Sequence, residues 1–391
     1  MLPLEGIKVV ALEHAVAAPI CTRHLADLGA EVIKIERPGE GDFARAYDSF
    51  VFGTSSFFVW LNRGKRSLTL DVKSQGSKDV LHRLIAGADV LIQNLAPGAA
   101  ARLGLSYEAL RPVNDRLIVA DISGYGDAGP FAQKKAYDLL IQAEAGLMSV
   151  TGTPEIPSRA GISAADIATG MYAQTAILAA LVRRGRTGQG ANVKIAMLDA
   201  VAEWMSFALY RHAYDGSAVA RSPSSHPALA PYGSHATMDG QVIFGLQNER
   251  EWAIFCNQVL ARPDMIADPR FNSNAARRDN RGDLTREIEN FFADKSSLQV
   301  VERLDAAGIA NGRLNTAQDV WDHVQFSARD RWREVGTPGG RVRALLPPFT
   351  FTDVEAAMGD VPALGQHTDA ILAELGFNAD EIAALHRKAA V

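Results

Sequence analysis

Short apolar runs alternate with helical patterns through the first half of the chain. Helical patterns such as Pro19–Leu28 and Lys78–Ile85 separate the apolar runs. The runs that read as buried strands are Ile7–Leu12, Glu31–Ile35, Ser67–Leu70, Asp89–Ile92, Leu117–Ala120 and Ala191–Ile195. This alternation predicts an α/β fold with a mostly parallel sheet covered by helices on both faces. Ligands of such sheets bind beyond the carboxyl ends of the strands, so we look for chemistry in the loops that follow them.

The second half of the chain differs from the first in composition and in hydrophobic pattern. Residues 217–226 are rich in Ser, Pro and Arg, which indicates a linker. Asp239-Gly240 then stands between two short apolar runs, which is a strong signal for a β-hairpin. Helical patterns at Glu249–Leu260, Leu284–Phe292 and Leu298–Ala307 follow. These features predict a smaller α+β unit after the first.

Composition and net charge argue against some classes of binding partner. The 391 residues carry a formal net charge of -5 and a sequence pI of about 6.0, which argues against nucleic acid or an anionic membrane as the main partner. No apolar run approaches the ~20 residues that span a bilayer, and no signal-peptide pattern opens the chain. The two cysteines form no metal or redox motif. We therefore expect a soluble, cytoplasmic protein without a metal site.

Several loops after the predicted strands combine glycine with a cation or an amide. The loop after the first strand, residues 13–19, lacks the G-x-G-x-x-G fingerprint, so a dinucleotide site of the usual kind is disfavoured. Loops at residues 36–42, 62–67, 94–98 and 124–126 carry glycine, proline, Arg, Lys or Asn. Each loop alone is explained by turns and solvation. Together at one sheet edge, they suit a long ligand such as coenzyme A, which needs separated cations and a glycine-lined groove.

One carboxylate stands alone at the start of a long Ala- and Leu-rich helix. Asp166 is the only charge there, and a helix N-terminus favours a carboxylate. Ser163, three residues earlier, completes a capping-box pattern, so Asp166 has two interpretations from local sequence. It is either part of a helix cap or a functional group.

From Leu4 to about Gly376 the chain resembles the class III CoA-transferases, the family of formyl-CoA transferase and carnitine CoA-transferase. The segments that carry the resemblance are the Ala17-Ala18-Pro19 turn with the helix to Gly29, Ile33–Arg37, Asn62–Asp71, Asn94–Gly104 and the region of Asp166. The resemblance implies that Asp166 is the catalytic nucleophile. It also implies an interlocked homodimer. Each subunit would have a large Rossmann-like, CoA-binding domain at residues 1–216, completed by residues 326–391, and a small α+β domain at residues 217–325.

The resemblance also assigns binding residues. Those expected to line the CoA site are Val16, Arg37, Leu70, Asn94, Lys135 and Tyr137. Val16 and Leu70 would act through backbone or apolar contact. Backbone amides near Gly245 are candidates for stabilising an oxyanion, and His14, Arg45 and His226 are candidates for a distal substrate carboxylate.

The expected reaction moves CoA from an acyl-CoA donor to a short carboxylic acid. As a whole the chain looks most similar to members that use succinyl-CoA and a C4–C5 dicarboxylate such as itaconate, mesaconate or citramalate. An aspartyl anhydride and an aspartyl-CoA thioester would be the intermediates. CoA is then a substrate, and no permanently bound cofactor is expected.

Three alternatives stay open. A 2-methylacyl-CoA racemase shares the resemblance, but its catalytic histidine falls where this chain has Tyr137-Asp138. A non-catalytic acyl-CoA-binding protein on the same fold would be marked by loss of the nucleophile, and Asp166 is present. A nicotinamide dehydrogenase is disfavoured by the missing fingerprint.

Overall fold

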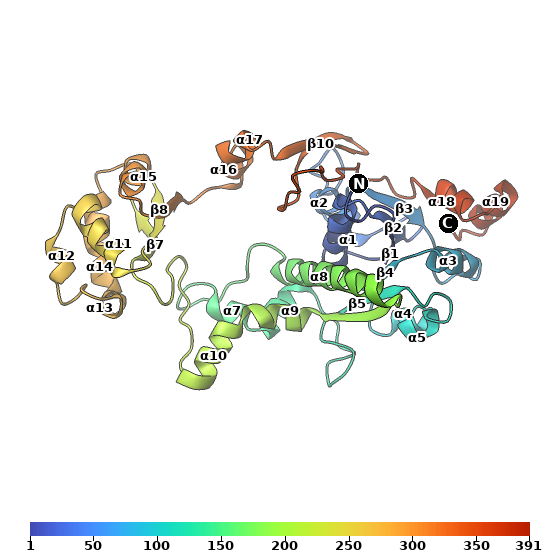
Figure 1. The fold of residues 1–391 in the computed structure, drawn as a ribbon, viewed down its shortest axis with the longest axis horizontal. Coiled ribbons are helices and arrows are strands. Elements are labelled where there is room, and N and C mark those ends of the chain that lie inside the picture. Colours follow the sequence, from blue (N-terminus) through green and yellow to red (C-terminus); the bar gives the residue numbers. More distant parts are fainter. The chain divides into compact units, whose positions relative to one another are not determined.

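The computed structural model describes residues 1–391, and the chain forms two compact units that we describe separately (Figure 1). The first unit comprises Met1–Leu147, Arg159–Leu209 and Ala328–Val391, and the second comprises Met148–Ser158 and Tyr210–Ser327. The domain boundaries expected from the sequence, at residues 216/217 and 325/326, stay predictions.

A six-stranded parallel sheet forms the centre of the first unit, which confirms the α/β prediction. Its strands are β1 (Lys8–Leu12), β2 (Glu31–Glu36), β3 (Lys65–Thr69), β4 (Val90–Gln93), β5 (Ile118–Ser123) and β6 (Ala191–Ala196). They lie in the order β3-β2-β1-β4-β5-β6. Val10 of β1 pairs with Ile33 on one side and with Leu91 on the other, so β1 is the central strand at which the chain order reverses. A topological switch point of this kind is where such sheets bind ligands.

Successive side chains of each strand lie on opposite faces of the sheet and contribute to two hydrophobic cores, one on each face. Val9 and Ala11 of β1 belong to one core, and Val10 and Leu12 belong to the other. The first core also contains side chains of α1 (Ala17–Asp27), α6 (Asp138–Glu144), α8 (Ala164–Thr187) and α9 (Met197–Trp204). The second contains side chains of α3 (Ser77–Ala86), α4 (Ala99–Arg102), α5 (Tyr107–Leu110), α18 (Thr368–Glu374) and α19 (Ala379–Arg387).

The end of the chain returns to its beginning within the first unit. Figure 1 shows α18 beside β3, and Thr368 at the start of α18 hydrogen-bonds Thr69 at the end of β3 (Oγ1 to Oγ1, 2.9 Å). The sequence missed several elements of this unit: η1 (Phe43–Ala46), α2 (Ser56–Asn62) and the hairpin of β10 (Trp332–Thr337) and β11 (Gly340–Leu345). Phe58 and Val335 pack together in a small core of their own, which joins α2 to this hairpin.

Helix α8 crosses close to α1, and this contact fixes the region around Asp166. A Cβ at Gly170 would lie 2.2 Å from Ile20 Cγ2 and 2.5 Å from the Ala17 carbonyl oxygen, so only glycine allows this approach. By length and composition α8 is apolar enough to cross a membrane, which the sequence analysis did not expect. A core helix passes the same test, and α8 packs against α1, α6, α9, β5 and β6.

The second unit is a small α+β structure. Its three-stranded antiparallel sheet has the order β7-β8-β9, and Asp239-Gly240 forms part of the connection between β7 and β8, as the hairpin signal predicts. The bounds of its elements are β7 (Tyr232–Ala236), β8 (Gln241–Gly245), β9 (Asn311–Arg313), α11 (Glu249–Ile254), the π-helix η2 (Phe255–Val259), α12 (Asp264–Ala267), α13 (Asn274–Asp279), α14 (Arg281–Phe292), α15 (Ser297–Ala306) and α16 (Ala317–Trp321). Three short helices span the junctions of the two units: α7 (Leu147–Val150), α10 (Ser206–Asp215) and α17 (Val324–Ala328).

Candidate active site

The loop that follows β1 lies at the switch point of the sheet and is held there by a side chain from beyond β4. Asn94 Oδ1 accepts the His14 backbone N–H (2.9 Å), and Asn94 Nδ2 donates to the His14 carbonyl oxygen (2.9 Å). Both ends of the Asn94 amide are therefore occupied by backbone. This geometry makes Asn94 a support for the residue 13–16 loop, whereas a direct CoA contact by its amide stays a prediction.

A second support for this loop comes from Asp42, just before η1. Its Oδ1 accepts the Ala15 N–H (2.9 Å), and Ala15 adopts a left-handed backbone conformation with φ of 62°. A non-glycine residue in that region is strained and persists only where its surroundings hold it. Asp42 therefore holds Ala15 in the conformation that carries the chain from β1 into α1.

Asp42 belongs to a buried group of four charged side chains that also contains Glu13, Lys34 and Lys65. Lys34 Nζ lies 2.7 Å from Asp42 Oδ2 and 3.3 Å from Glu13 Oε1, while Lys65 Nζ lies 2.7 Å from Glu13 Oε1. The four side chains are almost completely buried and carry two charges of each sign. Such a group is stable only when every charge is paired, and here each one is.

The pairing shows in the titration of these groups. Burial alone would raise the pKa of Glu13, but Lys65 and Lys34 lower it to about 2. Burial alone would lower the pKa of Lys34, and the carboxylates of Glu13 and Asp42 raise it instead. Burial lowers the pKa of Lys65 to about 8 against the pull of Glu13. Glu13 therefore stays ionised at neutral pH, and the residue 13–16 loop is supported by a fixed arrangement of charges.

Asp166 lies in the first turn of α8, half-buried, and no hydrogen bond holds its carboxylate. Burial, together with a smaller contribution from the nearby Asp138 carboxylate, raises the pKa of Asp166 to about 7. A poorly solvated, unbonded carboxylate is a stronger nucleophile than one bound by donors or water. The environment of Asp166 is therefore that of a reactive group.

The helix-cap interpretation of Asp166 does not describe this structure. Ser163 occupies the N-cap position of α8 but makes no side-chain capping bond. Asp138 Oδ1 accepts the amides of Ala165 (2.8 Å) and Asp166 (3.2 Å) instead. The Asp138 carboxylate of α6 thus accepts the free amides at this helix end, and the Asp166 carboxylate is not needed to cap α8.

The start of α1 lies against the start of α8. Val16 is buried in a small cluster with Ile20 and Leu61, and Ile167 packs against this cluster next to Asp166. No side chain caps α1, and its N-terminal amides at Ala17 and Ala18 have no acceptor within the chain. They are donors at a helix N-terminus that packs against the start of α8, and such donors suit a developing negative charge. The sequence carries no sign that the amides of the Ala17-Ala18-Pro19 turn would be unpaired at this position.

The remaining residues predicted to bind CoA differ in exposure. Arg37 is exposed after β2, where its guanidinium pairs with Glu40 (2.7 Å). Lys135 and Tyr137 are exposed just before α6, with 70% of Tyr137 accessible. Leu70 is buried, and its amide bonds the Glu36 carbonyl oxygen. The cations of Arg37 and Lys135 are thus accessible to an anionic ligand, and Leu70 is a buried apolar side chain that could support the site by packing.

Two of the residues predicted to bind substrate, Arg45 and His226, already have structural partners. Arg45 binds Glu36 through two nitrogens (2.8 Å each) and lies 3.7 Å above the ring of Phe58, so its guanidinium is not free for a carboxylate. His226 belongs to the second unit, where its ring stacks on Tyr232 at 5.0 Å.

Gly245 is also in the second unit, and its amide donates to the Ala310 carbonyl oxygen (3.2 Å). The next amide, at Leu246, donates to the Pro231 carbonyl oxygen. These two amides are therefore not free donors for an oxyanion in this structure. The role assigned to Gly245 lacks support from this geometry.

His14 keeps a free polar atom. Its ring stacks on Phe43 (4.8 Å) and its Nδ1 is buried without a hydrogen-bond partner. Burial lowers the pKa of His14, so the ring is neutral at pH 7 and can act as a hydrogen-bond donor or acceptor. Of the predicted substrate ligands, His14 is the one that the geometry leaves available.

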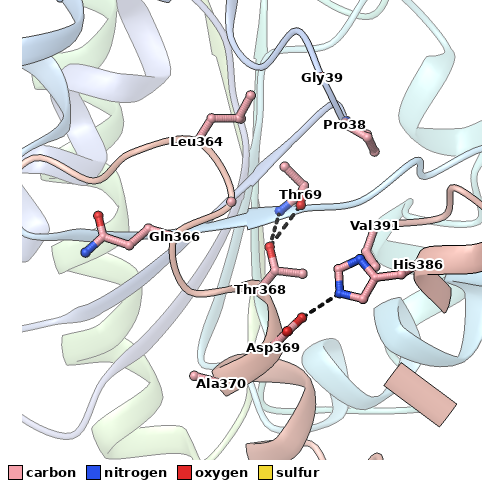
Figure 2. A pocket seen from close by; sticks show the side chains of 11 residues that line it. Pro38, Gly39, Thr69, Leu364, Gln366, Thr368, Asp369, Ala370, His386 and Val391 are labelled. Carbon is pink, nitrogen blue, oxygen red and sulfur yellow. Dashed lines mark hydrogen bonds and ion pairs between the residues drawn. The ribbon is translucent and has the colours of Figure 1, made fainter. Parts of the chain in front are cut away.

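A hollow of about 400 Å³ lies elsewhere in the first unit, between β3 and the C-terminal helices (Figure 2). Figure 2 shows the Thr69–Thr368 hydrogen bond and the Asp369–His386 pair (2.7 Å) among its lining residues. None of the lining residues belongs to the predicted CoA or substrate set. Because Asp369 is already paired, Asp166 is the better candidate for a nucleophile.

Comparison with known proteins shows the family of the chain. Residues 4–368 match the family described as CoA-transferase family III. The chain belongs to this family, and it is an enzyme of the class III CoA-transferase type. The family predicted from the sequence is thereby confirmed.

Named relatives and a solved structure cover almost the whole chain. It is 32% identical over 379 residues to succinyl-CoA:glutarate CoA-transferase of Mus musculus, covering 96% of this chain and 87% of the relative. It is 32% identical over 386 residues to succinyl-CoA:mesaconate CoA-transferase of Haloarcula hispanica, with coverages of 95% and 96%. The crystal structure of a CAIB/BAIF family protein from Brucella suis matches with a TM-score of 0.85 at 35% identity, over 96% of this chain and 99% of that chain.

Proposed function

We propose that the protein transfers CoA from succinyl-CoA to a five-carbon dicarboxylate through a covalent bond to Asp166. The observation that carries this proposal is the half-buried, unbonded carboxylate of Asp166, whose pKa burial and Asp138 raise to about 7. The relatives' names supply the substrate class: both use succinyl-CoA, and glutarate and mesaconate are dicarboxylates.

The chemistry balances in four steps. The Asp166 carboxylate attacks the donor thioester carbonyl, which forms a mixed anhydride and expels CoA thiolate. The thiolate attacks the aspartyl carbonyl, which forms an aspartyl-CoA thioester and releases succinate. The acceptor carboxylate attacks that thioester and expels the thiolate again. The thiolate then attacks the acceptor's carbonyl, which gives the new acyl-CoA and regenerates the Asp166 carboxylate.

The chain's own groups suit these steps. The amides of Ala17 and Ala18 would stabilise the oxyanion of each tetrahedral intermediate, and the small residues around Asp166 would exclude water that hydrolyses the anhydride. The side chain of Val16 would border the acyl group. His14, with its free Nδ1, would bind the distal carboxylate of the substrate.

A panel of donors and acceptors tests the proposed substrates. Succinyl-CoA and acetyl-CoA are each incubated with glutarate, mesaconate, itaconate, citramalate and a monocarboxylate of similar length, and new thioesters are separated by chromatography. We expect succinyl-CoA with a five-carbon dicarboxylate to give the highest kcat/KM. Faster transfer to the monocarboxylate would contradict the dicarboxylate assignment while leaving the Asp166 chemistry intact.

Arg37 is proposed to bind a phosphate of CoA. Its guanidinium is exposed and paired with an exposed Glu40, a contact that a phosphate can replace at little cost. We expect Arg37→Ala to raise KM for the CoA donor by about tenfold with a smaller effect on kcat, because binding energy remote from the reacting atoms is lost. Arg102→Ala, which removes a cation from α4, serves as a comparison for general loss of positive charge. An unchanged KM in folded Arg37→Ala would exclude Arg37 from the site.

The expected homodimer has support in exposed apolar side chains of the first unit. On α8, Met171 is 49% and Val182 is 60% exposed, and Leu139 and Leu140 of α6 are also exposed. A single chain that leaves such side chains in water is typical of a subunit whose partner covers them. Sedimentation equilibrium would test the dimer, and a monomeric mass would contradict it. The cytoplasmic location expected from the sequence also stays a prediction.

A further inference from the structure

Asp138 connects α6 to the helix that carries the nucleophile. It is the first residue of α6, and its Oδ1 accepts the backbone amides of Ala165 and Asp166 at 2.8 and 3.2 Å. The second of these amides belongs to the nucleophile itself. The backbone of Asp166 is therefore held by a side chain from another helix.

The other end of the Asp138 carboxylate is fixed as well. Its Oδ2 accepts a hydrogen bond from Gln142 Nε2 at 2.7 Å. Gln142 is fully buried, and its Oε1 accepts the Ala160 amide (2.9 Å) while its Nε2 also lies 3.3 Å from the Ile162 carbonyl oxygen. One network thus fixes Asp138 and the segment that leads into α8.

We propose that Asp138 is a positioning residue for the nucleophile, which holds the Asp166 backbone and places a second negative charge beside its carboxylate. This inference rests on the proposed function of Asp166. In this role Asp138 would act through Asp166 and not on the substrate itself. Neither the family match nor the expected CoA-binding set assigns it a role.

The second charge has a chemical consequence. While Asp166 is ionised, the two carboxylates repel each other across a poorly solvated site. Both covalent forms of Asp166, the anhydride and the thioester, are uncharged at the aspartyl group. The repulsion is therefore relieved when the Asp166 carboxylate first becomes the anhydride, and Asp138 favours that step.

Proton binding follows from the same arrangement. Burial, and then Asp138, raises the pKa of Asp166 to about 7, so the reactive carboxylate form is populated as pH rises through that value. The other titratable groups around it are Tyr47 and Tyr137; burial raises the pKa of Tyr47, with further contributions from Asp42, Asp166 and Tyr137. The Tyr47 phenol is therefore neutral at pH 7, and Asp138 is the nearby charge that raises the pKa of Asp166.

The test compares Asp138→Asn with wild type over pH 5 to 9. Asparagine keeps one oxygen that can accept the Ala165 and Asp166 amides, so a role limited to capping α8 predicts an unchanged kcat and pH profile. Its Nδ2, however, would face the donor Gln142 Nε2 where aspartate offers an acceptor, which disturbs the network that places Asp166. We expect kcat to fall by about 10- to 100-fold from the misplaced nucleophile, with KM for the donor little changed. We also expect the acid limb of the kcat profile to move to lower pH. An unchanged kcat and acid limb would overturn the proposal.

Two further variants sharpen the result. Asp79→Asn is the control variant, because it removes an acid from the first turn of α3, a helix that packs in a different core from α6 and α8. It should leave both kcat and the acid limb unchanged. Asp138→Glu keeps the charge but places it differently, so it should retain an acid limb close to wild type with a reduced kcat. An acid limb in Asp138→Glu that coincides with that of Asp138→Asn would contradict the charge effect.

A measurement without turnover separates this inference from the proposed function. The carboxyl carbon of Asp166 is followed by ¹³C NMR during a pH titration of the free protein and assigned by its loss in Asp166→Asn. A lower titration midpoint of Asp166 in Asp138→Asn would support the inference about Asp138. It would do so even if the wild-type protein formed no adduct with donor alone, because a missing adduct would count against the proposed function only. An unchanged midpoint overturns the inference even if transfer is confirmed.

Discussion

Asp166→Asn should abolish CoA transfer while leaving the fold intact. The amide cannot form an anhydride or a thioester, so we expect activity to fall by about 10³-fold or more. The wild-type protein given donor alone should gain the mass of an aspartyl-CoA adduct, because the first two steps need no acceptor. Hydroxylamine or borohydride should trap this adduct, and peptide mapping should place it on residue 166.

Stability distinguishes a lost nucleophile from a damaged helix. The raised pKa of Asp166 means that its charged form opposes folding, and this opposition grows as pH rises above the ordinary range of an aspartate. The unfolding midpoint of Asp166→Asn at pH 8 should therefore equal or exceed that of wild type. Asp199→Asn, at an exposed first-turn acid of α9, is the matched control and should retain transfer. An active Asp166→Asn variant, or an adduct elsewhere, would remove Asp166 from the mechanism.

The parallel sheet was predictable because each strand is a short apolar run bounded by polar turns. Val9–Leu12 and Val90–Ile92, for example, feed both cores of the unit and so show an almost continuous hydrophobic pattern. Elements without such a pattern were missed. The hairpin of β10 and β11 mixes charged and apolar residues, and Val335 is its one buried side chain, so it lacks the continuous apolar run that marks the parallel strands.

Leu198–Tyr214 is rich in apolar residues, and its local sequence predicts one continuous helix. The structure divides it at Met205 into α9 and α10, where local propensity alone predicts continuity. The junction of the two units falls within α10, at Leu209 and Tyr210. Leu198–Tyr214 contains no proline or glycine, so the local pattern gives no sign of the break at Met205.

The site was partly predictable for a similar reason. Asp166 was identifiable because a single charge among small residues is conspicuous in one segment. The support of Asp138 for α8 joins residues 27 positions apart, and that of Asn94 for His14 joins residues 80 apart. Such contacts depend on which strands become neighbours, so only the fold reveals them. For the same reason Arg45 resembled a free cation in sequence, although its partner Glu36 lies across a turn.

The buried charges beneath the residue 13–16 loop lead to the second large prediction. Lys34→Met keeps the length of the side chain but leaves Asp42 without its cation and Glu13 with Lys65 alone. Removing one partner from a fully buried ion pair costs about 3–5 kcal/mol, because the remaining charge stays desolvated. We expect hydrogen exchange of β1 and β2 peptides to report a loss of that size in the free energy of opening.

Two features separate lost charge pairing from poor packing of the methionine. Protonation relieves a buried carboxylate, so the loss should be smaller at pH 5 than at pH 8. The double variant Lys34→Met/Asp42→Asn removes the unpaired charge but keeps an oxygen that can accept the Ala15 amide, and it should recover much of the lost stability. Lys194→Met, in β6 with a solvent-exposed ion pair to Asp127, should leave the exchange of β1 and β2 unchanged. A double variant no more stable than Lys34→Met would show that packing, and not charge, holds the loop.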